Sequence, residues 1–205
     1  MAHAWDAEQK EMLKDFWKRQ GRFIVLALVL GAVLGWGWRM WQQHVLYQSA
    51  QASSSYEALQ AAFTAHDTKR VAALATYLQT QHAGTPYAAA GMLVRARDLV
   101  AVGAWADAKK ALDWVVAQSK KMPALRQVAR LELARLDLLQ HDPQSALSAI
   151  SVVDVAAYQP WVDRVRSEAL RQLGKKQDAQ DALKASAAGF LQEGVGAPFE
   201  RVMPR

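Results

Sequence analysis

The strongest constraint on the fold is a repeated pattern that fills most of the chain after its N-terminal third. Three prolines recur at intervals of 37 residues, and each opens a stretch with helical apolar periodicity: Pro86, Pro123 and Pro160. Each stretch reaches a turn residue, and an alanine follows five positions later: Gly103 and Ala108, His141 and Ala146, Gly174 and Ala179. A fainter earlier copy leads to His66. Such a period of helix, turn and helix is typical of a solenoid of helical hairpins.

Small residues are expected where the two helices of a hairpin cross. Ala96 with Ala108, and Ala134 with Ala146, allow the close approach of two helices. We therefore predict an all-α chain with hairpin repeats at about 49–85, 86–122, 123–159 and 160–190. The alternative is an irregular helical bundle with coincidental alanines. The chain beyond Gly189 is expected to lose helical support and to fray or cap the solenoid.

A single apolar run lies near the N-terminus. Residues 23–38 carry no charge and lie between Arg22 and Arg39, and extension to Trp41 gives a predicted transmembrane helix over residues 23–41. A buried core helix and a cleaved signal peptide are the alternatives. The run ends in Trp36, Trp38 and Trp41, which favours an interfacial anchor over a cleavage site with small residues.

The distribution of cations predicts the orientation. Five Lys and Arg residues lie between residues 10 and 22, whereas Arg39 is followed by no other cation until Lys69. Cations in short flanking segments stay in the cytoplasm. We expect a cytoplasmic tail at 1–22, a single span at 23–41 and a periplasmic domain at 42–205, in a bacterial inner membrane. The absence of cysteine from the chain agrees with this compartment.

Two features near the span have open interpretations. Apolar residues in the tail between Trp5 and Trp17 fit a short amphipathic helix or a solvated lead-in. Gly31 and Gly35 form one G-x-x-x-G spacing, which lets a second helix approach closely but is common in membrane helices. We take Gly31 and Gly35 as candidate partner-binding residues.

The sequence contains no recognisable catalytic or cofactor-binding motif. None of the five histidines belongs to a metal-ligand spacing, and no P-loop, G-x-S-x-G or G-x-G-x-x-G is present. His66-Asp67 and His141-Asp142 are interpreted as polar turn residues. We therefore expect no enzyme activity, no metal and no cofactor, and a membrane-tethered hydrolase has no supporting polar cluster. The expected solenoid from residue 42 onward has 19 Lys and Arg against 15 Asp and Glu, a charge of +4 that is dispersed along its length and faces away from the cytoplasm, which makes nucleic-acid binding improbable.

Binding is expected on the inner face of the solenoid. If the repeats align, arginines on the first helix of successive hairpins share this face: Arg97, Arg135, Arg164 and Arg171, with Glu168 near the last two. Such arginines can hold acidic or extended peptides, and a solvated basic face is the alternative. Trp105, Trp114 and Trp161 are either interface anchors or inter-helix packing residues.

The whole chain resembles the YfgM-like family of inner-membrane proteins. The resemblance rests on the span ending GWGWRMWQ, the following YQSAQASSSYEAL, and repeats built around LVRARDLVAVGAWADA, LELARLDLLQHDPQSAL and SEALRQLGKKQDAQDAL. The extreme C-terminus, GAPFERVMPR, lies outside this pattern.

The resemblance implies a TPR-like solenoid behind one transmembrane helix. It also implies a non-enzymatic role beside the SecYEG translocon, with a PpiD-like periplasmic chaperone and nascent polypeptides as partners. A cytosolic role of the tail in restraining a stress-response regulator is a further implication. The alternative function is a solenoid adaptor for envelope assembly or cell division, which uses the same fold with another partner.

Overall fold

The computed structural model describes residues 31, 35, 36, 38–40 and 49–192 of the 205-residue chain. The chain divides into two compact units, residues 1–50 and 51–205, which are treated separately below. The described residues of the first unit are helical. A Cβ atom added to Gly31 or Gly35 would meet nothing within 4 Å, so the predicted helix contact at these glycines stays a prediction.

The predicted transmembrane helix over residues 23–41 falls largely outside the described residues, as does the predicted tail helix. Among the residues that the structure does describe, no helix combines the length and apolarity needed to cross a membrane.

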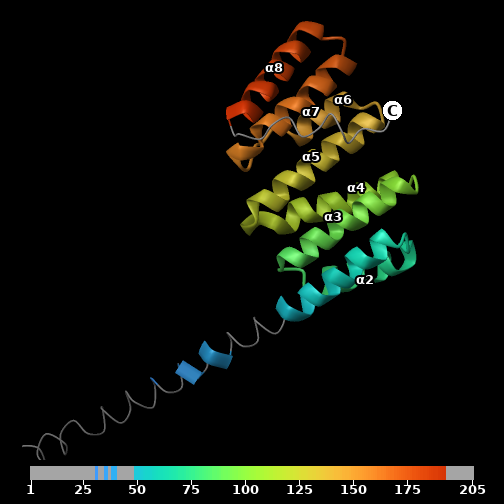
Figure 1. Ribbon diagram of the computed structural model, residues 1–205, viewed down its shortest axis with the longest axis vertical. Coiled ribbons are helices and arrows are strands. Elements are labelled where there is room, and N and C mark those ends of the chain that lie inside the picture. The colour runs from blue at the N-terminus through green and yellow to red at the C-terminus, as the bar shows by residue number, and fades with distance from the viewer. Residues whose placement is uncertain (1–30, 32–34, 37, 41–48, 193–205) are drawn as a thin grey trace, which may run out of the picture. The chain divides into compact units, whose positions relative to one another are not determined.

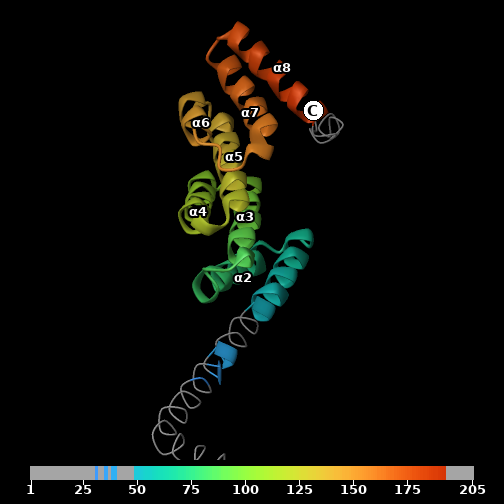
Figure 2. The ribbon, with the colours of Figure 1, turned by 90° about the vertical axis from the view of Figure 1, so that its left-hand side faces the viewer.

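The second unit is a stack of helical hairpins, and Figures 1 and 2 show these hairpins following one another in sequence order. Residues 51–64 are helical and pair with α2 (Thr68–Gln81). The next pairs are α3 (Pro86–Ala101) with α4 (Trp105–Gln118), α5 (Pro123–Leu139) with α6 (Pro143–Ala149), and α7 (Gln159–Gln172) with α8 (Lys176–Gln192). Within the described ranges there is no β-strand, which confirms the all-helical prediction.

One turn geometry closes every hairpin. The turn residues have positive φ angles of 55° at His66, 76° at Gly103, 58° at His141 and 76° at Gly174. The N–H of each turn residue donates to the carbonyl three residues earlier, and the next N–H donates to the carbonyl five residues before it. These eight bonds measure 2.9–3.1 Å and form the Schellman motif, which satisfies carbonyls at the end of a helix. All four predicted turn positions are thus confirmed.

The second helix of a hairpin begins directly after this turn. Asp67 and Asp142 are N-caps, and their carboxylates accept hydrogen bonds of 3.0 Å from the N–H groups of Arg70 and Ser145. The Ser145 side chain and its backbone N–H hold the pKa of Asp142 below its usual value. The His-Asp pairs are therefore turn-and-cap devices, which confirms their structural interpretation.

The residue five positions after each turn enters the core. Val71, Ala108 and Ala146 are fully buried and Ala179 nearly so. The crossing residues Ala96 and Ala134 are also buried, as the pattern predicts. One core cluster extends from the first hairpin to α5, and a second extends from α5 to α7. The partly buried tryptophans pack against these clusters, Trp105 and Trp114 on the first and Trp161 on the second.

The C-terminal helix extends further than the sequence pattern predicts. We expected helical support to end at Gly189, but α8 continues to Gln192. The glycine permits a close approach to α7, since a Cβ atom on Gly189 would lie 2.6 Å from Cγ of Pro160. Phe190 then packs edge-on against Trp161, with 4.8 Å between ring centroids. Residues 193–205, where capping or fraying was expected, lie outside the described residues.

We expect substitutions at the turns to separate backbone strain from packing. Nothing lies within 4 Å of a Cβ atom built on Gly174, so Gly174→Ala changes only the cost of the left-handed conformation. It should lower the free energy of unfolding by about 1 kcal/mol. His141→Gly should raise it or leave it unchanged, because glycine adopts positive φ without a Cβ penalty. Thermal and urea unfolding measure both effects, and equal destabilisation by the two substitutions would contradict this account.

Candidate partner-binding site

A pocket of about 260 Å³ opens between α3, α4 and α5. Seven of its ten lining residues are apolar and three are charged. The charged residues are Arg97 from α3, with Glu132 and Arg135 from α5. Two neighbouring hairpins therefore build the pocket together, and neither provides it alone.

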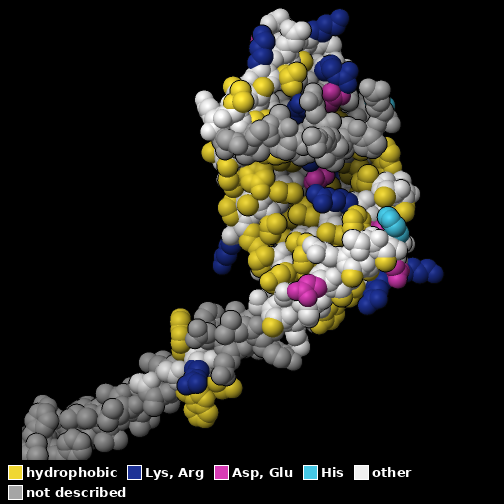
Figure 3. Space-filling view, viewed as in Figure 1, with side chains coloured by type: hydrophobic (Ala, Val, Ile, Leu, Met, Phe, Trp, Pro, Cys, Tyr) yellow, Lys and Arg dark blue, Asp and Glu magenta, His cyan; other side chains and the backbone are white. Residues whose placement is uncertain are grey.

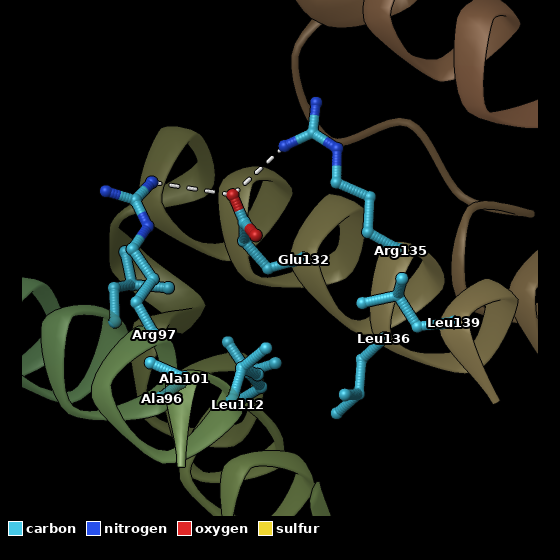
Figure 4. Close-up of a pocket in the computed structure, with 10 residues that line it drawn as sticks. Ala96, Arg97, Ala101, Leu112, Glu132, Arg135, Leu136 and Leu139 are labelled. Carbon is cyan, nitrogen blue, oxygen red and sulfur yellow. Dashed lines mark hydrogen bonds and ion pairs between the residues drawn. The ribbon is translucent and has the colours of Figure 1, made fainter. Parts of the chain in front are cut away.

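The two arginines share one carboxylate oxygen. Oε1 of Glu132 accepts a hydrogen bond of 3.0 Å from Nη1 of Arg135 and one of 3.4 Å from Nη2 of Arg97 (Figure 4). The first bond joins residues three apart on α5, whereas the second links α5 to α3. The predicted common face of Arg97 and Arg135 is thus observed, since both point toward Glu132.

An apolar floor adjoins this charged group. Leu112 and Leu136 are 2% exposed at the bottom, whereas Leu139 at the rim is 55% exposed. Figure 4 shows these leucines beside the arginine pair. In Figure 3, hydrophobic side chains gather over the α3–α5 part of the domain, with basic and acidic side chains among them. A ligand here meets apolar surface and charge within one site.

The charge balance of the pocket favours an anion. Two guanidinium groups against one carboxylate leave a local charge of +1. The side chains of Arg97 and Arg135 are 57% and 42% exposed, and each guanidinium has five N–H groups, of which Glu132 engages few. Donors are therefore available for a second carboxylate.

The other two predicted arginines do not join this pocket. Arg164 and Arg171 lie on α7 and are exposed. Arg171 donates hydrogen bonds to Glu168 from both Nε and Nη2. These bonds hold the pKa of Glu168 below its usual value and raise the pKa of Arg171. Glu168, six residues before its turn, holds the position that Arg97 and Arg135 hold in their hairpins. The position that is basic in the second and third hairpins is therefore acidic in the last one.

A second arginine pair serves the fold. Asp154, in the connection between α6 and α7, accepts hydrogen bonds of 2.5 Å from Arg126 and 3.1 Å from Arg130. Its side chain is only 4% exposed, and its backbone N–H donates to Gln127 at 2.6 Å. This cluster fastens the connection onto α5 and leaves its carboxylate inaccessible to a partner.

No group of acidic, histidine or cysteine side chains among the described residues is arranged to hold a metal ion. Most of the described carboxylates pair with arginines and lysines or cap helices. The arrangement at the α3–α5 pocket suits binding of a ligand that has both polar and apolar groups.

Sequence reasoning missed Glu132 and Leu139. Glu132 precedes Arg135 by three residues, which places the two on one helical face. The ion pair between Glu132 and Arg135 could therefore have been predicted from the sequence. The contact between Arg97 and Glu132, 35 residues apart, depends on how two hairpins stack, and no local pattern reports that.

Comparisons with known proteins agree on one family. The model of the tetratricopeptide repeat-like domain matches residues 14–199. A protein of Haemophilus influenzae named "Ancillary SecYEG translocon subunit" is 29% identical over 154 residues, covering 75% of this chain and 74% of that protein. Proteins of the same name from Escherichia coli and Aggregatibacter actinomycetemcomitans are 26% and 28% identical, covering 87% and 94% of this chain and 85% and 95% of their own lengths. No solved structure matches the chain.

We expect the two arginine clusters to differ in their contribution to stability. Arg97→Gln should change the free energy of unfolding by no more than about 0.5 kcal/mol, because its ion pair is exposed and long. Asp154→Asn should cost about 2–4 kcal/mol, because it leaves two partly buried arginines without their counter-charge. Urea unfolding of the two variants measures this difference, and similar losses would assign Arg97 a structural role.

Proposed function

The chain belongs to the YfgM-like family of tetratricopeptide repeat-like proteins, and from this membership we propose that it is a non-enzymatic, membrane-anchored scaffold of the SecYEG translocon. The observation that carries the proposal is the shared name of three relatives, one of which aligns over 94% of this chain. The repeat domain supplies a protein-binding surface, consistent with a scaffold.

The proposed anchor is the apolar segment at residues 23–41, with residues 1–22 in the cytoplasm and residues 42–205 in the periplasm of a bacterial inner membrane. The family match begins at residue 14, so it includes this segment together with the repeats. Gly31 and Gly35 are the proposed contact points for a translocon helix, because their spacing lets two helices approach closely.

The proposed work of the periplasmic domain is to receive polypeptides that leave the channel and to pass them to a PpiD-like chaperone. The α3–α5 pocket supports this role, because it combines an apolar floor with the half-exposed Arg97 and Arg135. Arg164 and Arg171, which are exposed on α7 outside this pocket, are proposed as a second contact, although Arg171 is already paired with Glu168.

Site-specific photocrosslinking in native membranes tests the assignment. A probe at Leu30 in the span should give adducts with translocon subunits, and a probe at Arg135 should give adducts with a periplasmic chaperone or a nascent chain. A probe at Lys184, which is exposed on α8 away from the pocket, is the matched control. Replacement of residues 23–38 by an unrelated apolar span, with the probe kept at position 30, should abolish these adducts. Adducts confined to envelope-assembly or division proteins would refute the translocon role.

Cysteine labelling tests the topology. The natural chain contains no cysteine, so single introduced cysteines report without background. In intact spheroplasts a membrane-impermeant maleimide should label Lys120→Cys, in the repeat domain, but should label Ala4→Cys only after lysis. The reverse pattern would contradict a cytoplasmic N-terminus.

A further inference from the structure

Glu132 occupies the place that a ligand carboxylate would take in the α3–α5 pocket. One of its oxygens, Oε1, accepts from both Arg97 and Arg135. The bond from Arg97 is 3.4 Å long, at the outer edge of hydrogen-bonding distance. Arg97 can therefore exchange this partner for another carboxylate without disturbing a helix.

The two bridged arginine pairs of the domain differ in accessibility. Asp154 holds Arg126 and Arg130 with a side chain that is 4% exposed and a backbone N–H fixed by Gln127. Glu132 is 22% exposed, and its two arginines are about half exposed. Both clusters have one carboxylate between two arginines. The carboxylate of Asp154 is inaccessible to a ligand, whereas the arginines bound to Glu132 can exchange it for a ligand carboxylate.

The surroundings of Glu132 define the remainder of the ligand. Leu93, Leu112, Leu136 and Leu139 line the pocket that the arginines border. An aliphatic side chain can cover these leucines while a neighbouring carboxylate reaches the guanidinium groups. Charge complementarity selects an acidic partner, because the pocket carries two cations against one anion.

We propose that this pocket binds polypeptide segments in which acidic residues stand next to leucine-like residues, and that Glu132 is an internal competitor for the ligand carboxylate. The proposal rests on the proposed function only in taking this face as a protein-binding surface. Exchange of one carboxylate for another keeps the arginines paired throughout, and the released Glu132 is hydrated. Binding is therefore weak and quickly reversed, which suits contact with a chain in transit.

Peptide binding to the full-length chain in nanodiscs tests the competitor role. The probe is the fluorescein-labelled peptide GSLLEDLLGS, followed by anisotropy with empty nanodiscs as background. Two matched peptides are GSLLQNLLGS, which lacks the acids, and GSSSEDSSGS, which lacks the leucines. Glu132→Gln should bind the acidic apolar peptide about three to ten times more tightly than the natural chain, and it should not gain affinity for the amide peptide.

Arg97→Gln and Arg135→Gln should weaken binding of the acidic apolar peptide, whereas Lys184→Gln on α8 should leave it unchanged. The melting temperature of Glu132→Gln shows whether this variant is folded. If it is unfolded, the two arginine variants still test the proposal. Equal affinity of the acidic and amide peptides would show a plain apolar groove and overturn the proposal. Unchanged or weaker binding by folded Glu132→Gln would do the same, as would absence of binding to all three peptides.

This assay contains no translocon, so the two proposals fail separately. Loss of the Leu30 adducts would remove the translocon role and leave the peptide preference standing. Failure of the peptide test would remove the competitor role of Glu132 and leave translocon association intact.

Discussion

Each hairpin depends on one residue in the left-handed region of backbone space. That residue lets two successive N–H groups turn back onto the carbonyls of the helix that is ending, and the next helix begins at once. Because the turn has a fixed length, the position five residues after it always enters the contact between the helices. Val71, Ala108, Ala146 and Ala179 are buried for this reason. Glycine meets the backbone requirement at Gly103 and Gly174, whereas His66 and His141 adopt the same geometry at some cost in strain.

The pocket follows from the same geometry. Each hairpin has the same turn between its two helices, so the first helices of successive hairpins present the same face. For this reason α3 and α5 bring Arg97 and Arg135 to one side. The small residues Ala96 and Ala101 on α3 leave space between the helices, and Leu112 of α4 closes the bottom. A groove between repeats therefore arises from hairpin stacking, and its chemistry is set by the few side chains at its rim.

The repeat pattern predicted the helices, the four turns and the buried alanines, because these depend on residues within one hairpin. It misjudged the end of the last helix, since the packing of Gly189 on Pro160 and of Phe190 on Trp161 spans the two helices of that hairpin. For the site, the shared face of Arg97 and Arg135 could be predicted from their common distance to the turn. The bridging role of Glu132 could not, because it depends on the distance between two hairpins.

The position six residues before each turn shows how far a single binding face can extend. It holds Gln60, Arg97, Arg135 and Glu168 in the four hairpins, so the charge is neutral, positive, positive and negative along the stack. Gln60 bonds with Tyr56 of its own helix, and Glu168 binds Arg171 of its own helix. Among these four residues, only Arg97 and Arg135 are linked across hairpins, through Glu132.

A row of arginines along the inner face, as the sequence had suggested, would hold a long acidic segment. The observed arrangement limits the arginines that meet across hairpins to the α3–α5 junction. Under the proposed function, this junction would contact only a few residues of a bound chain.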